Sequence, residues 1–249
     1  MPQGADMRVT VATITLERSD NAGGMLRTMQ SLADQGYSAC VGDGGSSAGF
    51  VERLRAMGHH VEQPGRHLRG QMESAFRSAA ERGSHVFYFE SDKVEFVETR
   101  LPATLRQYRT RGLDFATVGR RRREWYTFPA AQVEIERAQS TLIGGVLGIP
   151  GDWVAGPVLV PSAHVTTLAE SRWDGTDRHG WGVPWFLLGR AFRNGLKVGL
   201  IRTAPGVDPS ARNEFNPGYR FYQADSILGS FYEGAGMDYD WRDSKGVRV

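Results

Sequence analysis

The chain has 249 residues, of which 40% are hydrophobic and 23% charged, and this composition excludes a disordered or fibrous protein. Thirty Lys and Arg against 28 Asp and Glu leave a net charge of +2, which is too small to indicate a nucleic-acid binder. The single cysteine excludes an internal disulfide, no signal peptide or apolar run of about 18 residues is visible, and we therefore expect a cytoplasmic protein.

Short apolar runs alternate with helical patterns through the first 120 residues. The β-branched run from Arg8 to Leu16 predicts a buried strand, and apolar residues then recur at helical spacing until Gly36. Further strands are predicted over residues 38–42, 60–63 and 85–89, and further helices over 49–57 and 68–82. Such alternation predicts βαβ units on a parallel sheet.

The second half of the chain has a less regular pattern. Helices are predicted over residues 134–147, 184–194 and 219–233, a strand over 197–201, and an apolar loop over 151–161. No linker separates the halves, so we expect one domain over residues 1–249, with halves at about 8–120 and 121–249.

Polar or acidic residues follow three of the predicted strands, at residues 15–18, 43–47 and 90–92. Ligands of open α/β sheets bind beyond the carboxyl ends of the strands. Glu90 and Asp92 are separated by one residue, so both can face Mg²⁺ or Mn²⁺, whose other ligands would be water and phosphate oxygens. Taken alone, the pair fits solvated turn residues or helix caps equally well.

The turn at Asp43 is rich in glycine, which permits close approach of a ligand to the backbone. Its carboxylate could accept hydrogen bonds from a nucleobase or ribose, although an ordinary turn has the same composition. Arg66 and Arg69 flank the start of a predicted helix, where anions are attracted, and could meet a diphosphate or remain solvated. Neither a phosphate-binding P-loop nor a Gly-x-Gly-x-x-Gly motif is present.

A basic run, Arg120 to Arg123, precedes Trp125 and Tyr126. The low net charge argues against nucleic acid as its ligand. A substrate phosphate or an anionic membrane surface fits better than nucleic acid, but the run alone favours a plain solvated loop over any of these ligands. The histidines form no i,i+4 zinc pair and no Gly-x-Ser-x-Gly motif occurs, which argues against zinc enzymes and serine hydrolases.

These motifs resemble those of the GT-A nucleotide-sugar glycosyltransferases, specifically the family 2-like group. Residues 11–18 resemble the strand that places the nucleoside, and residues 41–47 resemble the Val-Asp-Asp-Gly-Ser-Thr turn. Residues 69–80 resemble the Gly-rich turn and Ala-rich helix, and residues 88–92 stand in the place of the Asp-x-Asp motif. Residues 182–195 resemble the acceptor-side helix. The resemblance covers residues 8–120 well and 150–235 loosely.

The resemblance implies an α/β fold of GT-A type, with a Rossmann-like open mixed sheet, mainly parallel and flanked by helices. It also implies metal-dependent transfer of a sugar from a nucleoside diphosphate to a hydroxyl of a saccharide, small molecule or lipid phosphate. Nucleic acid is not expected as a partner, membrane contact would be peripheral at most, and a homo-oligomer is possible.

Site residues follow from the same resemblance. The nucleotide sugar is assigned to Thr15, Glu17, Asp43, Arg66, Arg69, Gly70, Ser91 and Asp92, and Mg²⁺ or Mn²⁺ to Asp92 and Glu90. Trp153 and Trp181 are candidates for stacking on the acceptor, with buried core as the alternative for each.

The chain departs from the family at two motifs. Glu90 replaces the first aspartate, and Pro184 or Phe186 stands where relatives present the acid that deprotonates the acceptor. Asp174 and Asp177 are the nearest acids and become the candidate bases, which leaves an inverting or retaining outcome open. One alternative is a non-catalytic protein that binds a nucleotide sugar. A second is a sugar nucleotidyltransferase, although the glycine-rich opening loop of those enzymes is absent from this sequence. A third is a protein that binds nucleic acid through the basic run.

Overall fold

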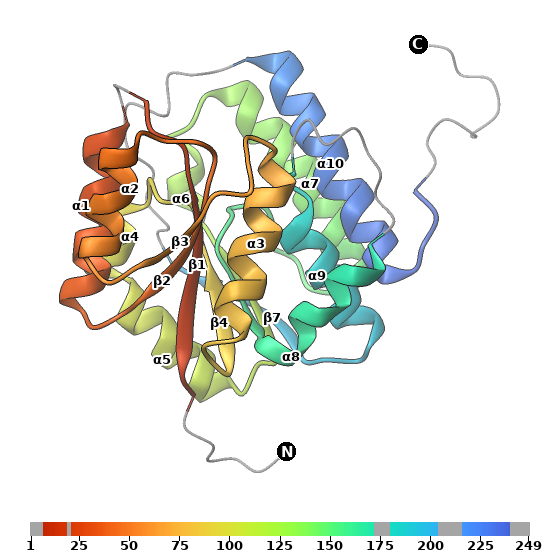
Figure 1. The fold of residues 1–249 in the computed structure, drawn as a ribbon. Helices are drawn as coiled ribbons and strands as arrows, with labels where there is room; N and C mark the ends of the chain where they lie inside the picture. The colour runs from red at the N-terminus through yellow and green to blue at the C-terminus, as the bar shows by residue number, and fades with distance from the viewer. Residues whose placement is uncertain (1–6, 19–20, 172–179, 204–215, 240–249) are drawn as a thin grey trace.

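The computed structural model describes residues 7–18, 21–171, 180–203 and 216–239, which form one seven-stranded sheet covered by helices on both faces (Figure 1). The strands are β1 (Val9–Thr15), β2 (Ala39–Asp43), β3 (His60–Glu62), β4 (His85–Tyr88), β5 (Phe115–Gly119), β6 (Val158–Pro161) and β7 (Val198–Arg202). The helices are α1 (Ala22–Asp34), α2 (Ala48–Ala56), α3 (Leu68–Ala80), α4 (Val94–Thr99), α5 (Leu101–Arg111), α6 (Arg122–Trp125), α7 (Ala130–Leu147), α8 (Ser162–Val165), the 3₁₀ helix η1 (Thr166–Glu170), α9 (Val183–Arg193) and α10 (Pro217–Ala235).

The strand order is β3-β2-β1-β4-β6-β5-β7, and β6 alone runs antiparallel to its two neighbours, β4 and β5. Because β4 and β5 are both antiparallel to β6, they run in the same direction, and β7 is parallel to β5. Consequently the carboxyl ends of β1, β2, β4, β5 and β7 all lie at one edge of the sheet. Ligands bind at this edge in open α/β folds.

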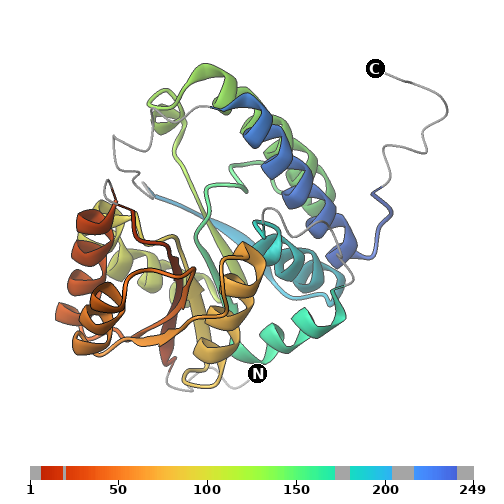
Figure 2. The same cartoon turned by 45° about the horizontal axis from the view of Figure 1, so that its top comes forward.

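Alternation along each strand divides the buried side chains between two cores. On β4, Val86 and Tyr88 join one core, whereas Phe87 joins the other together with Phe89, the residue after the strand. The first core is covered by α3, α7, α8, α9 and α10, and the second by α1, α2, α4 and α5, so the molecule has three layers (Figures 1 and 2). The mainly parallel α/β fold expected from the sequence is confirmed.

The strand β6 lies within the segment that we expected to be a loop, and this expectation was wrong. Its residues alternate between the two cores, with Val158 and Val160 on one side and Leu159 on the other. Pro157 precedes the strand and Pro161 is its last residue, so the strand has only four residues. The pairing with β4 and β5, which are distant in the sequence, makes these residues a strand, and no local pattern announces that pairing.

Helix α9 is buried over its first two turns. Pro184, Trp185, Phe186 and Leu187 are all buried, and α9 packs closely along α10. A Cβ added to Gly189 would overlap the backbone of α10, so glycine permits this close packing. Among the described residues, no helix is long and apolar enough to cross a bilayer.

Candidate functional site

Hydrogen bonds join the ends of β1, β2 and β4 at the ligand-binding edge of the sheet. The Thr15 hydroxyl donates to Asp43 Oδ1 over 2.9 Å, and the Gly44 N–H donates to the Thr15 carbonyl over 2.8 Å. The Ser91 hydroxyl donates to the Ile14 carbonyl over 2.8 Å. The structure therefore brings together three segments that the sequence resemblance assigned to one nucleotide-sugar site.

Asp43 is fully buried, and both of its carboxylate oxygens accept hydrogen bonds from the chain itself. The donors are the N–H groups of Gly45 and Ser46 at 3.0 and 2.9 Å, the Gln63 amide at 3.1 Å, and the hydroxyls of Thr15 and Ser46. Burial alone would raise the pKa of Asp43, but these hydrogen bonds outweigh it and lower the pKa. The ionised carboxylate thus shapes the turn, and direct contact with a nucleoside would require one of these donors to move.

Glu17 and Arg66 lie at the rim of the same turn. Glu17 accepts a hydrogen bond from the Ser47 N–H over 2.9 Å, and hydrogen bonding to the Ser47 hydroxyl and to this N–H lowers the pKa of its carboxyl. Arg66 is exposed, and its side chain lies about 4.0 Å from where a Cβ on Gly45 would stand. Gly45 has a φ of +104°, a conformation that favours glycine. The rim therefore offers one carboxylate and one guanidinium beside an open backbone turn.

Arg69 and Gly70 belong to the first turn of α3. The Arg69 guanidinium donates to Glu73 over 2.8 Å on the same helix, and nothing approaches within 3.9 Å of a Cβ built on Gly70. Gly180 packs directly against the backbone of Arg69, so the segment that enters α9 closes on the start of α3. The candidate bases Asp174 and Asp177 lie just before Gly180, outside the described residues.

The Glu90–Asp92 pair follows β4, and a lysine lies between the two carboxylates. The Lys93 ammonium is 3.0 Å from Asp92 Oδ1 and 3.7 Å from Glu90 Oε2. Within the described chain, neither of these buried oxygens receives a well-aligned hydrogen bond. Lys93 is only 7% exposed, so its charge belongs to the site rather than to the surface.

Each member of this cluster shifts the ionisation of the others. Burial raises the pKa of Glu90, with Asp92 adding to the effect and Lys93 opposing it. Burial would lower the pKa of Lys93, but Asp92 and Glu90 outweigh it, so the pKa is raised and the ammonium stays charged. Lys93 is not among the residues that the sequence assigns to the site. The only signal was its position next to Asp92, since its burial comes from the fold.

The pair fits a divalent cation that takes most of its ligands from elsewhere. Two carboxylate oxygens without aligned donors are suitable ligands for a hard ion. In the described part of the chain, no group of three or more His, Cys, Asp or Glu residues could hold a metal. A metal here would therefore depend on water and anionic ligand oxygens for the rest of its shell, as Mg²⁺ commonly does.

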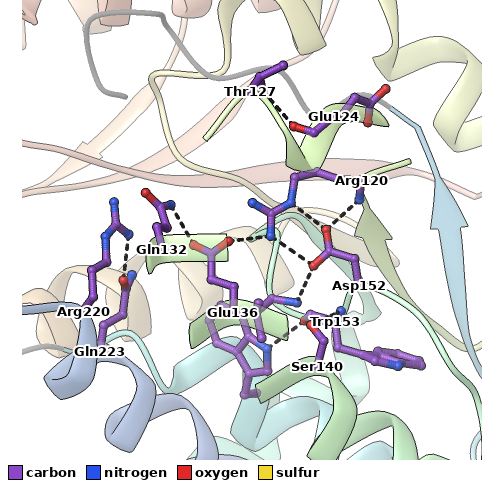
Figure 3. A network of polar contacts seen from close by, with 12 residues as sticks. Arg120, Glu124, Thr127, Gln132, Glu136, Ser140, Asp152, Trp153, Arg220 and Gln223 are labelled. Carbon is purple, nitrogen blue, oxygen red and sulfur yellow. Dashed lines mark hydrogen bonds and ion pairs between the residues drawn. The ribbon is translucent and has the colours of Figure 1, made fainter. Parts of the chain in front are cut away.

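Arg120 follows β5 at the same edge, and its buried guanidinium lies between two carboxylates (Figure 3). It contacts Asp152 over 2.7 Å and Glu136 over 2.6 Å, and it stacks on Trp125 with 4.0 Å from Cζ to the ring centroid. Burial alone would lower the pKa of Arg120, but the carboxylates of Asp152 and Glu136 outweigh burial, and the pKa is raised. Arg120 therefore forms structural ion pairs, so the interpretation of the basic run as a solvated loop was wrong for this residue.

Four further arginines line a cavity of about 520 Å³, which Arg120 and Asp152 of this ion pair also line. We call it the arginine cavity, and the four further arginines that line it are Arg121, Arg122, Arg137 and Arg202. Among these four, only Arg137 forms an ion pair with a described carboxylate, that of Glu134 at 3.4 Å. Hydrogen bonds from Arg122 and Arg137 lower the pKa of Tyr126, and the positive charges of the two guanidinium groups add to this effect. Such a cavity suits an anion.

The two tryptophans proposed for acceptor stacking have different surroundings. Trp153 is fully buried, and its indole N–H donates to the Ile149 carbonyl over 2.8 Å. It has no exposed face for a ligand, so the core alternative is correct for Trp153. Trp181 is partly buried, and its indole N–H donates to the Tyr219 hydroxyl over 2.8 Å, at the start of α10. Contact of Trp181 with a ligand stays a prediction.

No protein-family model matches the chain, and no curated protein matches its sequence. Solved structures with a similar fold include glucosyl-3-phosphoglycerate synthase from Mycobacterium tuberculosis in complex with Mn²⁺, UDP and glucosyl-3-phosphoglycerate. It is 16% identical, the match covers 96% of this chain and 83% of that chain, and the TM-score is 0.65. A complex of that enzyme with Mn²⁺, UDP-glucose and phosphoglyceric acid is 17% identical with the same coverages and a TM-score of 0.66.

A third structure of that enzyme contains Mn²⁺, UDP-glucose and glycerol 3-phosphate, and it is 17% identical with a TM-score of 0.64. The match covers 96% of this chain and 83% of that chain. Identities this low establish similarity of fold alone. The GT-A type fold that the sequence resemblance implied is confirmed.

Proposed function

We propose that this protein is a metal-dependent glycosyltransferase that moves a sugar from a nucleoside diphosphate to a hydroxyl of an anionic acceptor. The observation that carries the proposal is the convergence of the Glu90–Asp92 pair and the arginine cavity at one edge of the sheet. Two strand spacings separate the ends of β4 and β5, about 10 Å, which is the scale of a sugar diphosphate. The similar structures contain UDP-glucose, which is the first donor to test.

On the donor side, the turn shaped by Asp43 would receive the nucleoside against its open backbone. Glu17 could accept hydrogen bonds from ribose hydroxyls, and Arg66 could contact the diphosphate from above Gly45. Thr15 and Ser91 hold the strand ends in place. These residues bind and orient the donor, and orientation of the leaving group is a large part of transfer catalysis.

Glu90 and Asp92 would hold the metal, Mn²⁺ as in the similar structures or Mg²⁺. When bound, such an ion stabilises the negative charge that develops on the departing diphosphate. Each of the two carboxylates directs one oxygen to the same point, where the Lys93 ammonium lies. Their role would therefore be to bind a cation beside the leaving group.

On the acceptor side, the arginine cavity would bind a phosphate or carboxylate group of the acceptor. Arg202 is the last residue of β7, and Arg122 comes shortly after β5. An anion held by these arginines would therefore lie beside the donor. The similar structures contain phosphoglyceric acid or glycerol 3-phosphate, which have the required charge. Asp174 or Asp177 stays our prediction for the base that takes the acceptor proton.

A non-catalytic nucleotide-sugar-binding protein is the second candidate. The observation that favours it is the buried start of α9, where Pro184 and Phe186 replace the expected acid and present no group to the acceptor. Such a protein would bind the donor without consuming it.

One experiment separates these functions. UDP-glucose and Mn²⁺ are incubated with the protein and with either glycerol 3-phosphate or glycerol, and glucosylated product and UDP are quantified. We expect transfer to glycerol 3-phosphate and far less to glycerol, because only the former carries the phosphate group that the arginine cavity would bind. Tight binding of UDP-glucose with no product from either acceptor, or from phosphoglyceric acid, supports the second candidate instead. No binding of any nucleotide sugar contradicts both.

A further inference from the structure

Lys93 has a position that none of the roles above explains. It follows Asp92 directly, precedes the first residue of α4, and its backbone N–H donates to the Glu90 carbonyl over 3.2 Å. This turn folds the lysine back over the pair, and the side chain is 8% exposed against 38% for Asp92. A lysine with an ordinary surface role would extend into solvent.

The ammonium contacts the same two oxygens that a metal would need. It lies 3.0 Å from Asp92 Oδ1 and 3.7 Å from Glu90 Oε2, and both oxygens are buried and lack an aligned donor in the described chain. Metal–oxygen distances are shorter, about 2.1 Å for Mg²⁺. An ammonium and a divalent ion therefore cannot share these oxygens, because their charges would repel strongly at such a separation.

Charge balance gives the lysine an effect on metal affinity. Without Lys93 the pair would present two negative charges to an entering ion, and with Lys93 in contact the net charge is −1. Arg120 also lies close enough to repel the ammonium, so other positive charge already surrounds the position. A displaced ammonium needs another anion, and the diphosphate of a bound nucleotide would be the nearest one.

We propose that Lys93 is the resident cation of the Glu90–Asp92 pair and competes with the divalent ion for its oxygens. The free protein then binds metal weakly, and the ion enters together with a nucleoside diphosphate whose oxygens accept the displaced ammonium. The identity of the diphosphate rests on the proposed function, whereas the competition between lysine and metal does not. Lys93 is on this account a positioning residue that makes metal binding depend on the nucleotide.

The test is calorimetric titration of Mn²⁺ into nucleotide-free protein. Lys93→Met should bind Mn²⁺ about ten-fold or more tightly than the wild type, because a like charge within about 4 Å of the ligand atoms is gone. Lys93→Arg keeps the charge and should bind Mn²⁺ as weakly as the wild type. Lys197→Met is the control, because the Lys197 ammonium donates a hydrogen bond to the Arg111 carbonyl and takes no part in the Glu90–Asp92 pair. This variant should bind Mn²⁺ with the wild-type affinity.

A second titration follows UDP in the presence of a chelator. Wild type should bind UDP several-fold more tightly than Lys93→Met, because without metal the ammonium is the cation in contact with the pair. Lys93→Arg should restore part of this affinity. If Lys93→Met does not fold, Lys93→Gln replaces it in both titrations. The fold of each variant is checked by circular dichroism before titration.

The inference is overturned if the neutral variant binds Mn²⁺ no more tightly than the wild type, or if Lys93→Arg binds it as tightly as the neutral variant. In that case Lys93 would only neutralise buried carboxylates. The first titration contains no nucleotide, so it is independent of the proposed function. Tighter Mn²⁺ binding by Lys93→Met without any nucleotide-sugar binding by the wild type would overturn the function and support the competition.

Discussion

Asp43 and the Glu90–Asp92 pair lie at the same edge of the sheet, yet their carboxylates have opposite surroundings. Asp43 is fully buried and accepts hydrogen bonds from Thr15, Gly45, Ser46 and Gln63. The pair leaves two buried oxygens without an aligned donor in the described chain. A carboxylate whose bonding capacity is filled by its own chain maintains the fold. One that is left partly unfilled in a buried position is available to a ligand.

The same distinction applies to the arginines beyond β5 and β7. Arg120 is held between Asp152 and Glu136 and stacks on Trp125, whereas the described structure gives the side chain of Arg202 only a carbonyl, that of Pro150, at 3.0 Å. Arg120 therefore stabilises the edge, and Arg202 belongs to the surface that can meet an anion. Substitutions on the two sides of this comparison should affect different measurements.

The largest effect on stability is expected when Arg120 is removed. Arg120→Met leaves the buried carboxylates of Asp152 and Glu136 without compensation, which should lower the free energy of unfolding by about 3–5 kcal/mol. Arg121→Met, on an exposed neighbour, should change it by less than about 0.5 kcal/mol. Urea denaturation measures both. Equal effects of the two substitutions would show that Arg120 is not the structural member of the run.

Asp92→Asn should act on transfer more than on the fold. Loss of one ligand charge beside the departing diphosphate should lower the rate of transfer from UDP-glucose about 10²–10³-fold. The free energy of unfolding should fall by less than with Arg120→Met, because Glu90 still lies beside the buried ammonium of Lys93. Asp34→Asn, which replaces an exposed carboxylate on α1, serves as the control. A rate within a few-fold of the wild type would remove Asp92 from the site.

Arg202→Ala should weaken binding of the acceptor and leave binding of the donor unchanged. Hydrogen bonds to charged groups contribute about 1.5–3 kcal/mol, so the KM for glycerol 3-phosphate should rise about ten-fold or more. Affinity for UDP-glucose, measured by calorimetry, should not change. An unchanged KM, or an equal loss of donor affinity, would contradict the assignment of the arginine cavity to the acceptor.

Asp43→Asn should lower stability in a pH-dependent manner. Unsatisfied donors in the turn should lower the free energy of unfolding by about 1–3 kcal/mol at pH 7. The pKa of Asp43 is lowered in the folded state, so its ionised form stabilises the fold above about pH 4, and this contribution is lost as the pH falls through the lower folded-state value.

Unfolding of the wild type and of Asp43→Asn is therefore compared between pH 7 and pH 2. The difference between the two proteins should be present near neutrality and should shrink below about pH 4. Asp34→Asn, at an exposed carboxylate on α1, should show almost none of this loss. A difference that persists unchanged into acid would mean that the charge of Asp43 does not stabilise the turn.

Much of this edge could be predicted from the sequence, because the signals there are local. The β-branched run before Thr15 marks a strand, and the glycines after Asp43 mark a turn. Other features depend on distant partners. Arg120 is buried because Asp152 comes beside it from 32 residues away, and β6 is a strand only because β4 and β5 flank it.

Burial was the quantity that the sequence could not provide. Trp153 and Trp181 were equivalent candidates by residue type, and only packing against α7 and the neighbouring core separates the fully buried side chain from the partly exposed one. Lys93 was adjacent to the predicted metal ligands, but its role follows from an ammonium that is folded back onto them. Residue type and spacing predicted where a site would form, and packing determines which side chains remain available.

The central claim is that the Glu90–Asp92 pair binds a nucleotide sugar through a divalent ion. Calorimetric titration of UDP-glucose with Mn²⁺, or with a chelator in its place, tests it most directly. We predict that Mn²⁺ raises the affinity of the wild type for UDP-glucose about ten-fold or more, and that Asp92→Asn loses this gain while its affinity in chelator changes little. Equal affinities with Mn²⁺ and with chelator in the wild type would contradict the claim.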